Sequence, residues 1–224
     1  MNKWNYYKTY IFDCDGVLLD SNPIKSEAFY EVALPYGKEN AERLLTFHQE
    51  SGGVSRFEKF HYFLESILSI PAQETEVHKL LETFGQIVFQ RLLSCEETTG
   101  MREFIQALPR LARKIVVSGG MQQELREVFA IRNLDKYFDA IYGSPDTKFE
   151  ILAREQREDL MKKPTVFIGD SRLDYEAARS YGIDFIFISD YTEFQNWEVF
   201  FKQNKAHTVR NLSEIVLPIN LDLF

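Results

Sequence analysis

The sequence predicts an α/β fold, in which a Rossmann-like parallel sheet forms the core and an α-helical domain is inserted after the first strand. Three observations predict it. A short apolar run ends at Phe12, a long block with helical periodicity follows, and after Gly100 short β-branched runs alternate with amphipathic helices. Alternating strands and helices favour right-handed βαβ units and therefore a parallel sheet.

The bulk composition is that of an ordinary globular protein. The 224 residues are 45% hydrophobic, 14% aromatic and 27% charged, which disfavours disordered and fibrous classes. This length suits one full core with a smaller inserted module. The net charge is −8 and no Lys or Arg run stands out, so we expect no nucleic-acid or anionic-membrane partner.

The sequence shows no signal for a membrane or for export. No apolar run approaches the roughly 18 residues that span a bilayer. The N-terminal segment MNKWNYYKTYIFDCDG has no small-residue cleavage site. Two cysteines, Cys14 and Cys95, fit a reducing compartment. We therefore expect a cytoplasmic protein.

The first strand is predicted from Tyr7 to Phe12, and a helical block follows it. From Pro23 to Cys95 the apolar positions recur at helical spacing, which predicts about four helices and almost no strand. This block should form a separate lid hinged near residues 20–23 and 95–100. The predicted division is a core of residues 1–21 and 96–224 and a helical domain of residues 22–95.

The remaining chain predicts the other strands of the sheet. The runs KIVVSGG, FDAIYGS, TVFIGD and FIFIS alternate with helical patterns such as MQQELREVFAI and RLDYEAARSYG. After Tyr191 we expect a helix, a short strand near Ala206–Val209 and a closing helix.

Polar side chains follow several of these strands. They are Asp13 and Asp15 after the first, Ser118, Gly119 and Gly120 after the next, Lys148 a few residues beyond AIYGS, and Asp170, Ser171 and Asp174 after TVFIG. The carboxyl ends of parallel strands meet at one edge of the sheet, where α/β proteins bind their ligands. The sequence therefore predicts that four distant segments converge there.

The acidic residues at this edge predict a magnesium site. Asp13 and Asp15 are two apart, so in an extended backbone their side chains point the same way, and Gly16 suits a tight turn. Together with Asp170 and Asp174 they would repel one another without a divalent cation. Oxygen ligands with no His or Cys favour Mg²⁺ over zinc.

The same residues can carry out phosphoryl transfer. Asp13 can attack phosphorus and form an aspartyl-phosphate, and Asp15 can act as general acid and then as general base. The Ser118 hydroxyl, with the backbone N–H of Gly119, can bind phosphoryl oxygens. Lys148 supplies the positive charge that the nucleophile and the transferring group need.

The segments DCDGVLLDS, VVSGG, GSPDTK and GDSRLD resemble the four ordered motifs of the haloacid dehalogenase superfamily. The resemblance implies Asp13 as nucleophile, Asp15 as acid/base, Ser118 as phosphate binder and Lys148 as stabilising cation. It implies Mg²⁺ held by Asp13, the Asp15 backbone carbonyl and Asp170. Asp174 would be a direct ligand or a neighbour of one. Members with a cap between the first two motifs act on small substrates.

Within the expected cap, GVSR resembles the substrate-binding loop of β-phosphoglucomutases in this superfamily. Arg56 would then bind a phosphate or carboxylate of the substrate. Lys25, also a candidate substrate contact, lies at a hinge position where those mutases have a histidine. We expect a phosphatase of the phosphoglycolate phosphatase and β-phosphoglucomutase-like branch, acting on a sugar phosphate or sugar-acid phosphate, or on phosphoglycolate.

Some of these residues also have plainer interpretations. Ser118 could be the N-cap of the following helix, and Asp174 could be a first-turn acid that favours the helix dipole. Glu58 and Lys59 are expected at the surface, and Cys14 is expected to be a buried structural residue. The four histidines, His48 among them, show no metal-binding spacing.

The alternatives to a phosphatase are a phosphosugar mutase that shares every core residue, and a non-enzymatic module. The latter would be a response-regulator-like receiver or a degenerate phosphate-binding relative. The DxD spacing and the inserted helices disfavour a receiver. The expected partner is a small phosphorylated metabolite, and the protein is expected to be a monomer or a homodimer.

Overall fold

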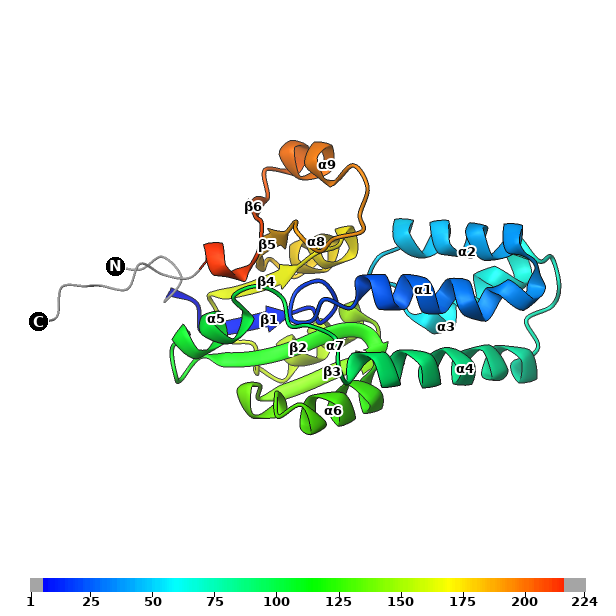
Figure 1. The fold of residues 1–224 in the computed structure, drawn as a ribbon. Helices are drawn as coiled ribbons and strands as arrows, with labels where there is room; N and C mark the ends of the chain where they lie inside the picture. The colour runs from blue at the N-terminus through cyan, green and yellow to red at the C-terminus, as the bar shows by residue number, and fades with distance from the viewer. Residues whose placement is uncertain (1–5, 216–224) are drawn as a thin grey trace, which may run out of the picture.

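The computed structural model describes residues 6–215, and within them six strands form one parallel sheet in the order β3-β2-β1-β4-β5-β6 (Figure 1). The strands are β1 (Thr9–Phe12), β2 (Arg113–Met121), β3 (Ala140–Ser144), β4 (Thr165–Gly169), β5 (Asp184–Ile188) and β6 (His207–Val209). The predicted α/β class and parallel core are confirmed.

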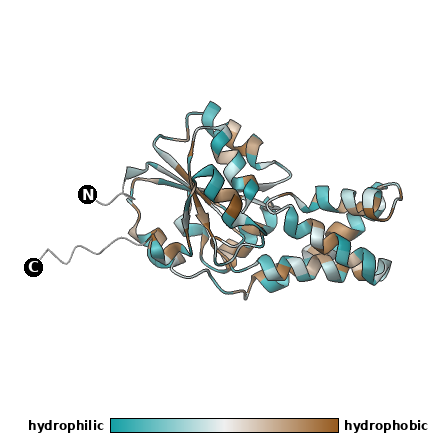
Figure 2. Cartoon of the chain, turned by 90° about the horizontal axis from the view of Figure 1, so that it is seen from above, coloured by the Kyte–Doolittle hydropathy of each residue, from teal (hydrophilic) through white to brown (hydrophobic). Residues whose placement is uncertain are grey.

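Helices cover both faces of the sheet because β1 is apolar on both sides. Tyr10 and Phe12 point into one core with α5 (Met101–Ala107) and α6 (Gln122–Ile131). Ile11 points into the other core with α7 (Lys148–Arg157) and α8 (Arg172–Ser180). Figure 2 shows hydrophobic residues gathered along the strands, with more hydrophilic residues on the outer helix faces.

Between β1 and β2 the chain forms helices that extend from one end of the sheet (Figure 1). They are α1 (Asn22–Ala33), α2 (Lys38–Glu50), α3 (Arg56–Tyr62), a π-helical turn (Phe63–Ile67) and α4 (Glu74–Leu92). In α4 the buried residues Val77, Leu80, Phe84 and Val88 recur every three or four positions. This periodicity gives α4 one apolar face, which packs on α1 and α3.

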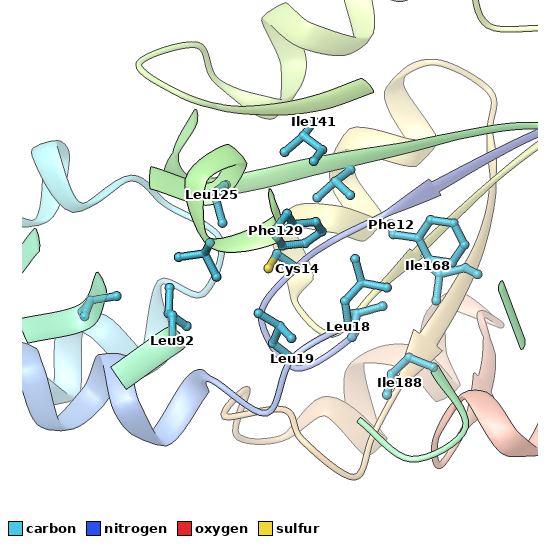
Figure 3. Packing of buried hydrophobic residues seen from close by; sticks show 14 of the residues in the cluster. Phe12, Cys14, Leu18, Leu19, Leu92, Leu125, Phe129, Ile141, Ile168 and Ile188 are labelled. Carbon is cyan, nitrogen blue, oxygen red and sulfur yellow. The ribbon is translucent and has the colours of Figure 1, made fainter. Parts of the chain in front are cut away.

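The chain enters and leaves these helices along two adjacent segments. Leu19 forms an antiparallel bridge with Glu97, and the Asp20 N–H donates to the Glu96 carbonyl at 2.9 Å. Leu92, at the end of α4, shares a core cluster with Leu19 and Leu125 (Figure 3). This arrangement supports the division into a core of residues 1–21 and 96–224 and a helical domain of residues 22–95, which we keep as a proposal.

The C-terminal part contains α9 (Trp197–Asn204) followed by β6, as expected, and a short 3₁₀ turn (Leu212–Glu214). The rest of the expected closing helix lies outside the described residues. Within residues 6–215 no helix is both long and apolar enough to cross a membrane.

Candidate active site

The candidate site lies where the carboxyl ends of β1, β2 and β4 meet. The strand order places β1 between β2 and β4, and the chain crosses from one side of β1 to the other between β3 and β4. Ligands of open parallel sheets bind at such a switch point. Asp13 follows β1 directly, and its backbone N–H donates to the Ile168 carbonyl of β4 at 2.9 Å.

A tight turn after Asp15 brings the first and last acidic segments together. Gly16 has φ +71°, and a Cβ at this position would lie 2.3 Å from Oδ2 of Asp170. Only glycine allows both this backbone conformation and this close approach.

Lys148 is the central cation of the site. Its Nζ lies 2.9 Å from Asp13 Oδ1 and 2.5 Å from Asp174 Oδ1, and all three side chains are buried. The residue occupies the first position of α7, where Thr147 and Glu150 form a capping box that fixes the start of the helix. Burial alone would lower the Lys148 pKa, but the charges of Asp13 and Asp174 raise it. Lys148 is therefore charged.

Asp174 also has a structural role, as its plainer interpretation anticipated. Its Oδ2 accepts hydrogen bonds from the Ser171 N–H at 3.1 Å and the Ser171 hydroxyl at 2.7 Å, which makes a capping box at the start of α8. A Cβ on Gly169 would lie 2.4 Å from the Asp174 Cβ, so the strand end must be glycine for the acid to approach. Helix capping thus fixes the carboxylate that faces Lys148.

Three buried carboxylates form a group that suits a divalent cation. Asp13, Asp170 and Asp174 each offer an oxygen, and these oxygens lie within 4.8 Å of one another. Burial and then repulsion from Asp174 and Asp15 raise the Asp13 pKa to about 7. The attraction of Lys148 lowers this pKa but only partly offsets the rise. Burial and the same kind of repulsion also raise the Asp170 pKa. A hard cation would relieve this repulsion, so the residues fit the expected Mg²⁺.

The Asp15 side chain points away from this acidic group toward the helical insertion. Its Oδ1 accepts a hydrogen bond from the Ser21 hydroxyl at 2.6 Å, and its Oδ2 forms an ion pair with Lys25. Burial would raise the Asp15 pKa, but the charge and hydrogen bond of Lys25 lower it. Lys25 is thus placed at the acid/base candidate, and it lines the same cavity.

Ser118 lies in β2 beside these carboxylates. Its hydroxyl is 3.5 Å from Asp15 Oδ2 and accepts a hydrogen bond from the Gly120 N–H at 3.0 Å. The interpretation of Ser118 as a helix N-cap is wrong, because β2 continues to Met121 and α6 begins only at Gln122.

A cavity of about 70 Å³ separates this sheet edge from the helical insertion. Asp13, Asp15, Asp170 and Gly119 line one side, and residues of α1 to α4 line the other. A Cβ on Gly119 would lie 2.6 Å from the Gly53 carbonyl oxygen, so the loop before α3 closes directly over the predicted phosphate-binding loop.

The structure places Arg56 in this cavity, already paired. Its Nη2 lies 2.7 Å from Oε1 of Glu124 on α6, and its guanidinium packs 5.5 Å from the Phe84 ring centre. Arg56 therefore links the helical insertion to the core, and Glu124 neutralises its charge.

The surface position expected for Lys59 is wrong. Glu58 is exposed, but Lys59 is only 2% exposed and lines the cavity with His48. Its Nζ lies 2.7 Å from His48 Nδ1. Lys59 follows Arg56 by one helical turn, and this spacing was the signal in the sequence that both face the same way.

Two further residues were missed by sequence reasoning. Asn22 donates from Nδ2 to Asp170 Oδ2 at 2.7 Å, and Glu193 accepts from the Ser26 hydroxyl at 2.7 Å. Both contacts connect α1 to the core. Neither residue belongs to a motif, so the sequence held no signal for them.

Comparison with known proteins identifies relatives of this chain. The model of the haloacid dehalogenase-like hydrolase family matches residues 10–188. A phosphorylated carbohydrates phosphatase from Thermotoga maritima is 32% identical over 185 residues, which cover 79% of this chain and 82% of the relative.

Solved structures share the fold. A "predicted phosphoglycolate phosphatase" from Haemophilus somnus superposes with a TM-score of 0.73 at 18% identity, over 94% of this chain and 96% of its own. CbbY from Rhodobacter sphaeroides, in complex with phosphate, superposes with a TM-score of 0.70 at 19% identity, over 97% of this chain and 100% of its own.

Proposed function

This chain belongs to the haloacid dehalogenase-like hydrolases, and from this premise we propose that it is a phosphatase that releases inorganic phosphate from a small phosphate monoester. One observation carries the proposal. Asp13, Asp15, Ser118 and Lys148 come from three separate segments, and their side chains meet at one buried edge of the sheet.

In this proposal Asp13 is the nucleophile. Its carboxylate oxygen attacks phosphorus, the bond from phosphorus to the ester oxygen breaks, and an aspartyl-phosphate forms. The Lys148 charge, 2.9 Å from Asp13 Oδ1, favours the ionised carboxylate and offsets the charge that develops on the phosphoryl oxygens. The Ser118 hydroxyl and the adjacent backbone N–H of Gly119 would bind those oxygens.

Asp15 is the proposed acid/base. It gives a proton to the departing alkoxide and then takes one from the water that attacks the aspartyl-phosphate, which releases phosphate and restores Asp13. Its contacts support its position, because Ser21 and Lys25 hold the carboxylate beside Ser118 and away from the three-acid group, and the Lys25 charge favours the ionised form that acts as the base. Lys25 is proposed to position Asp15 and to shape the substrate side of the cavity.

A magnesium ion would be held by Asp13, Asp170 and the backbone carbonyl of Asp15, with Asp174 as a further ligand or as a neighbour that orients Lys148. When bound, Mg²⁺ supplies positive charge that neutralises phosphoryl oxygens. The raised pKa values of Asp13 and Asp170, caused first by burial, support a site that holds a cation.

The substrate is proposed to be small because the helical insertion covers the site. Sugar phosphates and sugar-acid phosphates are the leading candidates, in keeping with the carbohydrate phosphatase relative, and phosphoglycolate follows. A mutase would use the same core residues but return the phosphate to another position of the product. The ion pair of Lys25 with Asp15, at a position where the mutases that the sequence resembles have histidine, favours the phosphatase.

The test is phosphate release from a panel of sugar phosphates, sugar-acid phosphates and phosphoglycolate, with and without Mg²⁺. Asp13→Asn keeps the size of the side chain and removes the nucleophile, so it should abolish magnesium-dependent release. If phosphate stays bound to carbon and moves to another hydroxyl, the protein is a mutase. If wild type and Asp13→Asn release phosphate equally, the proposal is wrong.

A further inference from the structure

The cations around the cavity differ in their partners. Lys148 is paired with Asp13 and Asp174, Lys25 with Asp15, and Arg56 with Glu124. Lys59 is the exception: within residues 6–215 no carboxylate oxygen lies within 4.0 Å of its Nζ. A buried ammonium without a counter-charge is costly, so its presence in a ligand cavity requires an explanation.

The contacts of Lys59 leave one donor for a ligand. Its Nζ is 2.7 Å from His48 Nδ1 and 3.4 Å from the His48 carbonyl. An ammonium carries three N–H donors and no acceptor, so His48 Nδ1 must be the acceptor and the third N–H has no partner from the histidine. Lys59 thus has a fixed direction, with its Nζ also 5.4 Å from the Phe29 ring centre, and one N–H for which residues 6–215 offer no hydrogen-bond acceptor.

His48 is itself held in place. It packs on the Phe29 ring with a centroid distance of 4.4 Å, and its Nε2 lies 3.7 Å from Glu193 Oε2. Burial first, and then the charges of Lys59 and Lys25, lower the His48 pKa, so the imidazole stays neutral and keeps Nδ1 as an acceptor. With the Lys59 ammonium as donor, the neutral ring carries its proton on Nε2.

We propose that Lys59, oriented by His48, selects substrates that carry a second anionic group, a carboxylate or a second phosphate, besides the phosphate that is cleaved. This inference rests on the proposed function. It assigns the second group to α3 in the helical insertion, because the sheet edge already provides Ser118 and Lys148 for the reacting phosphoryl group. Arg56 on the same helix is neutralised by Glu124, which leaves Lys59 as the cation that a second anion would neutralise.

The test compares esters that differ in the second group. Glucose 6-phosphate has none, 6-phosphogluconate has a carboxylate, glucose 1,6-bisphosphate has a second phosphate, and p-nitrophenyl phosphate reports the core chemistry alone. The variants are Lys59→Met, which keeps length and removes charge, and Lys79→Met as the matched control. Lys79→Met is the same substitution on α4, at a position where the lysine side chain is 71% exposed.

We expect wild type to prefer one of the two anionic esters over glucose 6-phosphate, and the preferred ester identifies the group. Lys59→Met should lower kcat/KM for it by about 10- to 100-fold, the range for a lost hydrogen bond to a charged group. It should leave glucose 6-phosphate and p-nitrophenyl phosphate nearly unchanged, and Lys79→Met should leave the preference intact.

His48 is a positioning residue in this account, so its variants give a second readout. His48→Asn keeps an acceptor near Nδ1 and should retain most of the preference, whereas His48→Leu should lose it through a higher KM with little change in kcat.

Two outcomes would overturn the inference: an equal loss of kcat/KM on all four esters in Lys59→Met, or a wild type without preference for an anionic ester. If wild type hydrolyses none of the esters, the proposed function fails instead. Calorimetric binding of 6-phosphogluconate and glucose 1,6-bisphosphate to wild type and Lys59→Met then decides the inference separately, since equal binding by the two proteins would refute it.

Discussion

The two sides of the cavity differ in how their charges are balanced. At the sheet edge, Lys148 lies between Asp13 and Asp174, and Asp15 is paired with Lys25. On the helical side, the Lys59 Nζ lies beside a neutral histidine and 5.4 Å from the Phe29 ring centre, and no carboxylate oxygen of the residues described lies within 4.0 Å of it. Three buried side-chain atoms in residues 6–215 lack a hydrogen-bond partner, namely Asp13 Oδ1, His48 Nε2 and Arg56 Nε. The first of these still lies 2.9 Å from the Lys148 Nζ. All three residues line the cavity.

The difference indicates a division of labour. The sheet edge is preorganised, because strands and helix caps hold each charged group beside its partner before any ligand arrives. The helical side contains Lys59, whose positive charge an anionic group of the substrate would neutralise. Chemistry is therefore expected to depend on the sheet edge for every substrate, and selectivity on the helical side.

Among variants of the two sides of the cavity, Lys148→Met is expected to have the largest effect. Without the lysine, Asp13 and Asp174 face each other buried and unpaired, so kcat should fall by roughly 10²- to 10³-fold for every ester. Unfolding free energy should fall by about 3–5 kcal/mol, as for a broken buried ion pair. Steady-state kinetics and urea unfolding measure both changes.

Magnesium provides the control for that variant. A cation bound among the acids should restore part of the lost stability, so added Mg²⁺ should raise the melting temperature of Lys148→Met more than that of wild type. Equal magnesium shifts in the two proteins would show that the acids do not hold the ion.

A smaller effect is expected from Gly119→Ala, which tests whether the two sides must close on each other. The added methyl group would meet the Gly53 carbonyl oxygen at 2.6 Å, and backbone cannot easily move away. A displacement of this size should lower kcat/KM by about 10²-fold. Gly120→Ala is the control, because its Cβ would meet only the flexible Leu125 side chain at 3.3 Å. Similar losses in both variants would refute a special role for closure at Gly119.

The pH dependence separates the two sides further. Burial first, and then the Lys25 charge, lower the Lys59 pKa from 10.5 to about 7. Only the protonated amine attracts an anion, so kcat/KM for an anionic ester should decline as the pH rises through about 7. The charged or titratable groups that act on Lys59 are His48, Lys25, Asp15, Glu193 and Glu58. Lys59→Met should lack this decline, and a decline that persists there belongs to another group.

The titration of Lys59 should also be visible in the pH dependence of the unfolding free energy, and proton linkage gives the direction of the change. Between about 7 and 10.5, Lys59 is neutral when folded and protonated when unfolded, so the unfolded chain binds more protons. The unfolding free energy of wild type should therefore rise relative to that of Lys59→Met as the pH rises through this window. The variant should be the more stable protein at the low end, and a gap in melting temperature that stays constant would contradict the shift.

The smallest effect is expected from Glu124→Gln, which frees Arg56 from its carboxylate. The Glu124 side chain is 24% exposed, so the loss of the ion pair should cost roughly 1 kcal/mol of unfolding free energy. KM for an anionic ester should fall a few-fold, because the Arg56 charge is no longer offset by a carboxylate. A change in kcat with p-nitrophenyl phosphate would instead assign Glu124 to the chemistry.

The sequence predicted the sheet edge better than the helical side for a physical reason. Asp13 and Asp170 follow strands and Ser118 lies near the end of one, and the parallel order of the strands fixes where they meet, so short motifs and strand periodicity were enough. Asp174 and Lys148 lie in the first turns of helices whose capping boxes are also local signals. In one and the same conformation, Asp174 caps the start of α8 and lies in the acidic group with Asp13 and Asp170.

The helical side depends on contacts between elements far apart in the chain. Lys59 is buried because α3 packs against α2 and α4, and the only signal for this in the sequence is its spacing of three residues from Arg56. Glu193 meets Ser26 across 167 positions of sequence. From its charge alone a lysine is expected to be exposed, but the packing of the helical insertion buries Lys59.

The proposed role of Asp13 as carrier of the phosphoryl group can be tested in the Asp15→Asn variant with p-nitrophenyl phosphate. Nitrophenolate leaves without needing an acid, but the variant lacks the proposed base for hydrolysing the aspartyl-phosphate. We predict a burst of one nitrophenolate per enzyme, a hydroxylamine-sensitive phosphate on the peptide that contains Asp13, and no burst in the Asp13→Asn, Asp15→Asn double variant. Turnover without a burst, or phosphate on another residue such as Ser118, would contradict the account.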